Sequence, residues 1–297
     1  MASAIHRLPD VQANALARAY AGQIATRRRQ TLFGAALLVA LAIAAGAVGE
    51  ANLPKLVGNI GNFTSYIDRL FHLDSGALVF TDVSEWFWGV TQKNKWLPLL
   101  GETLLIAYIG TITGAVGAFV WSFLAAQNLI QSPWLRMAAR RFLEFCRTVP
   151  ELVFALIFVV AFHLGPLPGI LALAIHTTGA LGKLFAEVVE NIDMKPVEGL
   201  TSTGGTWVQM VRFAVLPQVL SNFVSYTLLR FEINVRSAGI MGFVGAGGIG
   251  QELLVSIRKF YYSDVSAILL LLIVTVMAID LITERLRHTL IGQEYGA

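Results

Sequence analysis

Charge is scarce in this chain: only 14% of its 297 residues are Asp, Glu, Lys or Arg, whereas 56% are hydrophobic. Because soluble domains carry about 25% charged residues, the chain has too little charge to cover a surface that faces water. We therefore expect a lipid bilayer to surround much of the molecule. Cysteine is scarcer still, and the single Cys146 excludes both a disulfide within the chain and a cysteine-based metal site.

The surplus of basic residues is small, with a net charge of +3, and its distribution argues against nucleic acid as a partner. The basic residues form short clusters between long uncharged runs, whereas a nucleic-acid surface gathers them on one face. Clusters that flank apolar runs are typical of the cytoplasmic ends of membrane spans. We therefore expect no nucleic-acid partner.

Several stretches of the chain predict membrane-spanning helices, each of which needs about 20 mostly apolar residues. They lie at 32–48, 97–126, two within 148–182, 213–236 and 262–282. The stretch 148–182 is too long for one span, and Gly165-Pro166-Leu167-Pro168-Gly169 is a turn signal through which a helix does not run. The pattern therefore predicts an all-α polytopic membrane protein with about six transmembrane helices.

The first apolar stretch admits two interpretations. The small residues Ala45, Gly46 and Ala47 would suit cleavage of a signal peptide. The leader at 1–31 is long for the charged region of such a peptide, however. We therefore expect an anchor helix that stays in the protein.

The arginine clusters predict the orientation of the spans, because cytoplasmic loops carry an excess of Lys and Arg. With six spans, the clusters at 27–29, 136–147 and 285–287 fall on the same side. Both chain termini are then cytoplasmic. The chain divides into three predicted parts: residues 1–30 as a cytoplasmic N-terminal segment, 31–96 as the first transmembrane helix with an external loop, and 97–287 as the main transmembrane domain.

The stretch 187–217, between the fourth and fifth spans, predicts a helix, a turn and a second helix on the cytoplasmic side. Pro196 suits the first turn of a helix, where no backbone donor is needed, and Gly204 can take the positive φ that ends it. One apolar stripe follows at helical spacing: Trp207, Met210, Val211, Ala214 and Val215. Such an elbow either merely connects two spans or serves as a handle for a cytoplasmic partner.

The same stretch resembles the signature loop of ABC importer permeases, in which E-A-A is followed by three residues, a glycine, nine residues and I-x-L-P. The matching positions hold Glu198, Gly204, Leu216 and Pro217. The chain departs from this pattern at Gly199 and Leu200, where alanines are usual, and at Ala214, where isoleucine is usual. The residues at these positions are small or apolar, so we expect the elbow to keep its shape.

The resemblance extends over about 102–287, and three longer strings resemble the phosphonate-importer branch: Arg147–Val153, His176–Lys183 and Gly242–Gly250. It implies the type I ABC importer permease fold over 97–287, with 187–217 as the loop that docks on an ATPase subunit. It further implies that Glu198 makes a polar contact with the ATPase subunit, and that Gly204 forms the sharp turn that lets the helix dock there. The candidate coupling residues are therefore Glu198, Gly199, Gly204, Leu216 and Pro217.

The resemblance also implies the partners: two ATPase subunits, a second permease copy in a homodimer, and an external substrate-binding protein. No Walker A sequence occurs, since Gly182-Lys183 is followed by Leu184 rather than Ser or Thr. We therefore expect no cofactor, metal or catalytic residue in this chain, and ATP with Mg on the partner ATPase. The implied location is the bacterial inner membrane. The implied substrates are phosphonates or related phosphorus oxyanions, with phosphite, phosphate and methionine left open.

Two other classes of protein are weighed against an importer subunit. A self-contained secondary transporter would need interrupted helices in both halves, and the interruption near Gly247 has no counterpart in the first half. A membrane-embedded enzyme would need a nucleophile and a base, such as Glu151 with His163 or His176. No His–Glu spacing in the sequence supports that site, and we expect the two histidines to lie at an interface.

Charged residues near the end of the fifth span are candidates for the translocation path, because charges inside lipid usually face a cavity or each other. They are Arg230, Glu232, Asn234 and Arg236. Glu232 and Arg236 are four residues apart and can pair on one helix face, whereas Arg230 has no such partner nearby in the sequence. Two interpretations stay open. Either Arg230 or Arg236 lowers the energy barrier for an anion that crosses the membrane, or both side chains only pair with other residues or extend to the membrane surface.

Glycines after the fifth span predict a bend near an external gate, with Gly245, Gly247 and Gly248 as the candidate residues. Their spacing matches a dinucleotide-binding fingerprint, but that fingerprint needs a preceding strand and a βαβ unit. The surrounding sequence predicts neither. Irregular backbone at membrane depth is tolerated where it lines a cavity, which favours the bend.

Overall fold

A computed structural model of the chain describes residues 10–49 and 52–294. Residues 1–9 of the predicted N-terminal segment, 50–51 and 295–297 lie outside the described residues. Every regular element in the described ranges is a helix, which confirms the predicted all-α class. The chain forms two compact units, Met1–Tyr66 and Ile67–Ala297, and each is described by itself.

The first unit contains α1 (Asp10–Val48), α2 (Leu53–Gly58) and most of α3 (Ile60–Arg69). The predicted anchor helix is present in α1, where 22–48 is long and apolar enough to cross a membrane. The helix itself begins at Asp10, before the predicted apolar stretch 32–48, and includes the arginines at 27–29. The residues before the apolar stretch include many Ala, Arg and Gln, which are good helix formers.

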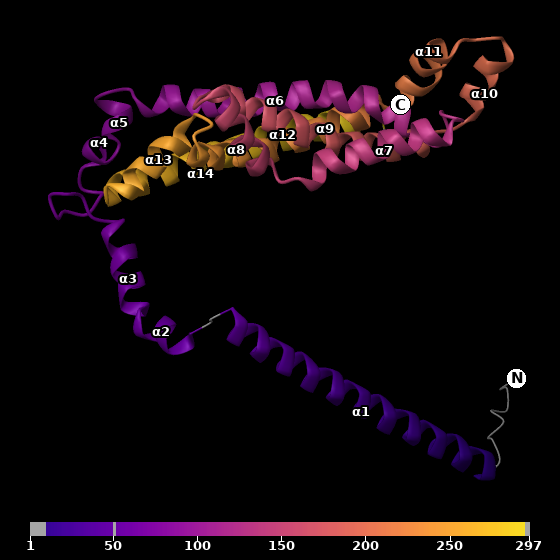
Figure 1. Ribbon diagram of the computed structural model, residues 1–297, viewed down its shortest axis with the longest axis horizontal. Helices are drawn as coiled ribbons and strands as arrows, with labels where there is room; N and C mark the ends of the chain where they lie inside the picture. Colours follow the sequence, from indigo (N-terminus) through magenta and orange to yellow (C-terminus); the bar gives the residue numbers. More distant parts are fainter. Residues whose placement is uncertain (1–9, 50–51, 295–297) are drawn as a thin grey trace, which may run out of the picture. The chain divides into compact units, whose positions relative to one another are not determined.

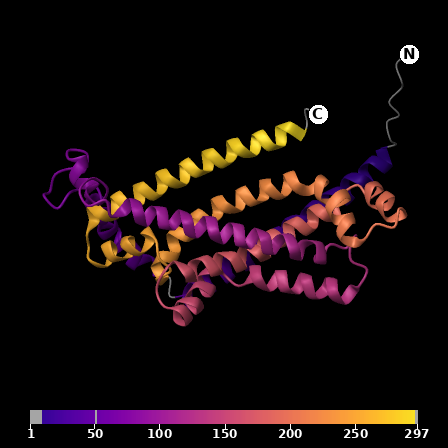
Figure 2. The ribbon, with the colours of Figure 1, turned by 90° about the horizontal axis from the view of Figure 1, so that it is seen from above.

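The second unit is a bundle of long helices lying side by side (Figures 1 and 2). Its long members are α6 (Trp96–Ala125), α7 (Pro133–Thr148), α9 (Pro166–Glu190), α12 (Leu216–Met241) and α14 (Tyr262–Glu294). Two short helices, α10 (Lys195–Ser202) and α11 (Trp207–Met210), project at one end of the bundle. At the other end lie α4 (Val83–Trp86), α5 (Trp88–Thr91) and α13 (Ile249–Arg258).

Four of the predicted membrane spans lie in helices of the described residues that are long and apolar enough to cross a membrane by themselves. The other two lie in bent pairs of helices, α7 with α8 and 207–244 with α13, which raise the total to six. In the first pair, α8 (Glu151–Phe162) has 12 residues that extend about 18 Å, short of the roughly 30 Å of a bilayer core. It reaches spanning length only together with α7, from which it is bent by 84°. Pro150 interrupts the helix between the two, because proline lacks the backbone donor.

Glycines on α6 bring that helix close to α9. A Cβ at Gly110 would meet Leu173, one at Gly114 would meet Thr177, and one at Gly117 would meet Thr178. The Thr178 hydroxyl also donates to the backbone carbonyl of Gly114 at 3.2 Å. Small residues at this spacing let two helices approach in lipid, where packing and interhelical hydrogen bonds drive association.

We expect Gly114→Ala to weaken the α6–α9 contact. The added Cβ would lie 2.6 Å from Thr177 Cβ and 2.8 Å from the Ala174 carbonyl oxygen, and such overpacking costs about 1–3 kcal/mol. The measurement is the midpoint of thermal unfolding in detergent, which should fall by several degrees. Gly101→Ala is the matched control on the same helix, because nothing lies within 4 Å of its added Cβ. Equal midpoints for the two variants would contradict the packing role.

The segment before α6, predicted as an external loop, packs on the bundle instead of standing free. The indole of Trp88 donates to Asp264 at 2.7 Å and that of Trp86 donates to Ser266 at 2.9 Å. Lys95 pairs with Glu252 of α13 at 2.6 Å. The short helices α4 and α5 therefore form a cap on α13 and on the start of α14.

Candidate functional site

The stretch 187–217 folds into the predicted elbow. Pro196 lies in the first turn of α10, and Gly204 takes a φ of 80° in the turn after it. A capping box then starts α11: the Thr206 hydroxyl accepts from the Gln209 backbone, and the Gln209 side chain accepts from the Thr206 backbone. The elbow projects beyond the ends of the long helices (Figure 1).

The chain enters α12 through a wider helical turn that the sequence did not predict. Val211–Val215 form a π-helix between α11 and α12. Pro217 follows within the first turn of α12, and its ring cannot sit beside a normally placed carbonyl one turn earlier. The π turn accommodates this proline and rotates the predicted apolar stripe. Ala214 and Val215 are buried, whereas Trp207 is 40% exposed.

The outer face of α10 is open to a partner. Val197 is buried in an apolar cluster with Ala214 and Val215, so that side of α10 holds the elbow together. Glu198 and Gly199 are exposed, and a Cβ at Gly199 would meet nothing within 4 Å. The small residue thus leaves a smooth surface beside the Glu198 carboxylate.

Hydrogen bonds attach the elbow to the helices that carry it. The Gln218 side chain of α12 accepts from the Asp193 backbone N–H at 3.0 Å and donates to the Asp193 carbonyl at 3.2 Å. The Asp193 carboxylate in turn accepts from the Lys195 backbone N–H at 3.0 Å, at the start of α10. These hydrogen bonds connect the start of α10 to α12.

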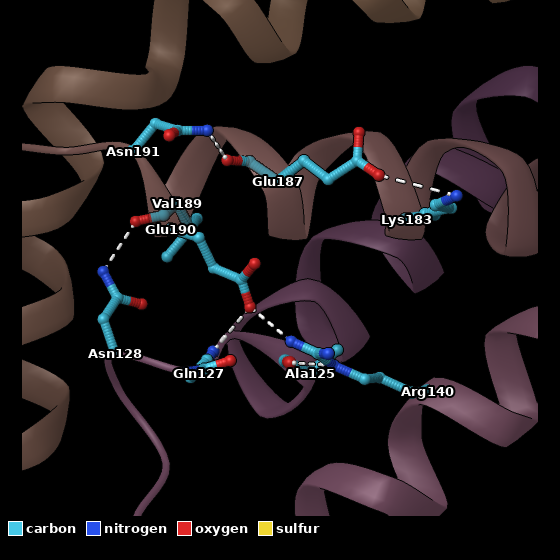
Figure 3. A network of polar contacts seen from close by, with 9 residues as sticks. All are labelled: Ala125, Gln127, Asn128, Arg140, Lys183, Glu187, Val189, Glu190 and Asn191. Atoms are coloured by element: carbon cyan, nitrogen blue, oxygen red, sulfur yellow. Dashed lines mark hydrogen bonds and ion pairs between the residues drawn. The ribbon is translucent and has the colours of Figure 1, made fainter.

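A polar network at the base of the elbow joins α6, α7 and α9 (Figure 3). One oxygen of Glu190 accepts from the Arg140 guanidinium at 2.5 Å and from the Gln127 backbone N–H at 2.7 Å. Arg140 also donates to the Ala125 carbonyl at 3.0 Å, and the Asn128 amide donates to the Val189 carbonyl at 2.8 Å. Arg140 was predicted only as part of a basic loop, because its carboxylate partner is 50 residues away.

A second polar cluster lies inside the bundle, around Arg230 of α12. Its guanidinium donates to Nδ1 of His176 at 2.5 Å and lies 3.4 Å from the Thr177 hydroxyl. On the other side of His176, Nε2 lies 3.6 Å from a Glu151 oxygen. Ser237 donates to the other Glu151 oxygen at 2.9 Å. Arg230 is thus paired, but with residues far away in the sequence, and the cluster excludes His163.

The other candidate residues on α12 have different surroundings. Asn234 is fully buried and donates to Thr111 and Thr177 at 2.8 and 2.9 Å, so it joins α12 to α6 and α9. The predicted pair of Glu232 and Arg236 is confirmed. Asp280 of α14 adds a second carboxylate 3.7 Å from Arg236.

The glycine-rich stretch is the predicted bend. Between α12 and α13, Gly245, Gly247 and Gly248 have φ values of 85°, 82° and 76°, which residues with a Cβ rarely adopt. The first N–H groups of α13 are satisfied from α6: Gly248 donates to Glu102 at 3.3 Å and Ile249 donates to Thr103 at 2.9 Å. Glu102 and Thr103 were not predicted as site residues, because their partners are 146 residues away.

A helical bundle with several membrane spans, buried polar clusters and a projecting elbow defines a membrane-embedded transport subunit. Residues 118–291, more than half of the chain, match the family described as the inner membrane component of binding-protein-dependent transport systems, and the chain belongs to this family. It is a multi-pass inner-membrane permease of an ABC importer, of the phosphonate type.

Two relatives come from Stutzerimonas stutzeri. The phosphite transport system permease protein PtxC is 42% identical over 194 residues, which are 65% of this chain and 70% of the relative. The putative phosphite transport system permease protein HtxC is 32% identical over 268 residues, which are 90% of this chain and 89% of the relative. Among solved structures, an inward-facing MetNI methionine ABC transporter has a TM-score of 0.56 at 20% identity, covering 65% of this chain and 95% of that chain. This last likeness supports the fold alone.

Proposed function

We propose that this permease forms the translocation path for a phosphorus oxyanion, such as phosphite or a phosphonate, driven by ATP hydrolysis on separate subunits. The observation that carries the proposal is the identity to permease proteins named for phosphite transport, which with HtxC extends over 90% of this chain. The permease performs no covalent chemistry in this proposal. ATP and Mg bind to the partner ATPase, which pushes on the elbow.

The proposed assembly contains two ATPase subunits, two permease copies in a homodimer and an external substrate-binding protein. The open face of α10, with exposed Glu198 and Gly199, is the surface that we assign to the ATPase. The elbow and both termini are then cytoplasmic, on the side of the arginine clusters. The bend at 245–248 lies toward the external gate, where the binding protein delivers the substrate.

Reconstituted transport tests this proposal. The permease would be placed in proteoliposomes with the ATPase and the binding protein of the same transport system, and uptake of labelled phosphite, methylphosphonate, phosphate and methionine would be measured with and without ATP. We expect ATP-dependent uptake of phosphite or methylphosphonate. Uptake that persists without ATP would indicate a secondary transporter, and uptake of methionine alone would contradict the proposed substrate class.

A further inference from the structure

An open recess lies beside the Arg230 cluster, at the break between α7 and α8. It has a volume of about 370 Å³ and is lined by Arg147, Thr148, His176 and Ala180. Since one water occupies about 30 Å³ of liquid, the recess has room for a tetrahedral oxyanion with part of its hydration shell. Three of its four lining residues are polar or charged, so the recess suits a hydrated ligand better than a lipid chain.

The protonation state of His176 follows from its partner. Arginine has only N–H donors, so Nδ1 of His176 must accept from Arg230, at 2.5 Å. The neutral ring then carries its proton on Nε2. The nearest carboxylate oxygen, on Glu151, is 3.6 Å from Nε2, which is too far for a good hydrogen bond. The ring also makes a hydrogen bond with the Arg147 backbone, so an anion at the recess would share the Nε2–H group with that carbonyl.

The charges around the recess favour an anion. Arg147 and Arg230 supply two positive charges, and Glu151 supplies one negative charge. Within residues 10–49 and 52–294, no carboxylate lies at ion-pair distance from the Arg147 guanidinium, which belongs to an exposed residue. Arg236 differs in this respect, since Glu232 and Asp280 both lie beside it. Of the two candidate arginines on α12, Arg236 thus lies beside two carboxylates, whereas Arg230 donates to His176.

We propose that this recess is an oxyanion subsite of the translocation path. Arg147 and the Nε2–H group of His176 would contact a phosphorus oxyanion, and charge-assisted hydrogen bonds of this kind are stronger than neutral ones. Arg230 is a positioning residue, because it holds His176 in the tautomer that donates into the recess. The identity of the anion rests on the proposed function, whereas the site rests on the geometry.

The test uses the complete complex in proteoliposomes and measures both phosphite uptake and ATP hydrolysis stimulated by the loaded binding protein. We expect Arg147→Met and His176→Leu each to lower uptake by about tenfold or more, the factor expected when a charge-assisted hydrogen bond is lost. ATP hydrolysis should fall much less than uptake, because the nucleotide binds to the partner subunits and not at the recess. His176→Gln, which restores an N–H donor near the place of Nε2, should recover much of the uptake.

Arg285→Met is the matched control, because it removes the same charge from an exposed position on α14 and should not change uptake. Unchanged uptake in both Arg147→Met and His176→Leu would overturn the subsite. A parallel fall of uptake and ATP hydrolysis would also overturn it, since that result indicates a structural role. A wild-type complex that imports no phosphorus oxyanion would instead contradict the proposed function.

Discussion

Gly199→Trp is expected to abolish ATP-driven uptake and to prevent co-purification of the ATPase, while the permease itself stays folded. The physical reason is that a side chain at this position meets nothing in the chain, so the indole extends outward from α10. It would occupy the surface beside Glu198 that we assign to the ATPase. Uptake, ATPase recovery after affinity purification and monodispersity in detergent are the three measurements.

The control for this variant is Gly61→Trp on α3, which adds the same side chain at another exposed glycine with open space around it. It should retain both uptake and the ATPase. If Gly199→Trp kept a full complement of ATPase, the outer face of α10 would not be the docking surface. A loss of monodispersity in Gly199→Trp would show that the added side chain disturbs the permease itself.

Gly250→Leu is expected to prevent correct folding of the bundle. A Cβ at this position would overlap the carbonyl oxygen of Gly239, and because that atom is backbone, α13 would have to move away from α12. Overpacking costs about 1–3 kcal/mol and occasionally more, and the displacement would also break the hydrogen bonds to Glu102 and Thr103. We expect little protein in the membrane fraction and early aggregation in detergent.

Gln251→Leu provides the matched comparison, because it places the same side chain one residue further along α13, at an exposed position. Its yield and elution profile should match wild type. Normal yield and uptake in Gly250→Leu would show that α12 and α13 are not packed as closely as the structure has them.

The elbow could be predicted from sequence because its signals are local. Pro196, Gly204 and Pro217 each constrain the backbone at their own position, and the structure places a helix start, a positive φ and another helix start there. The pairing of Glu232 with Arg236 was predictable for the same reason, since it joins residues four apart on one helix. The turn at Gly165 and Pro166 likewise separates α8 from α9.

Contacts between distant parts of the chain could not be predicted in this way. Glu151, His176 and Arg230 come together only because α8, α9 and α12 pack side by side, and single-sequence periodicity does not say which faces meet. The short length of α8 was not predicted. The apolar run 148–182 suggested a full span before the turn at Gly165, whereas the helix begins only after Pro150 and ends at Phe162. The π turn before Pro217 was missed because the apolar pattern fits an ordinary α-helix equally well.

The cap that Glu102 and Thr103 place on α13 restricts how the permease can rearrange during a transport cycle. Sliding α13 along α6 would strand two backbone N–H groups away from water, at a cost of about 1–3 kcal/mol each. The first turns of α6 and the whole of α13 should therefore move together as one rigid body. The cap formed by α4 and α5 should move with them, because Lys95 pairs with Glu252 of α13. Alternating access would then require the other parts of the bundle to tilt relative to this rigid body.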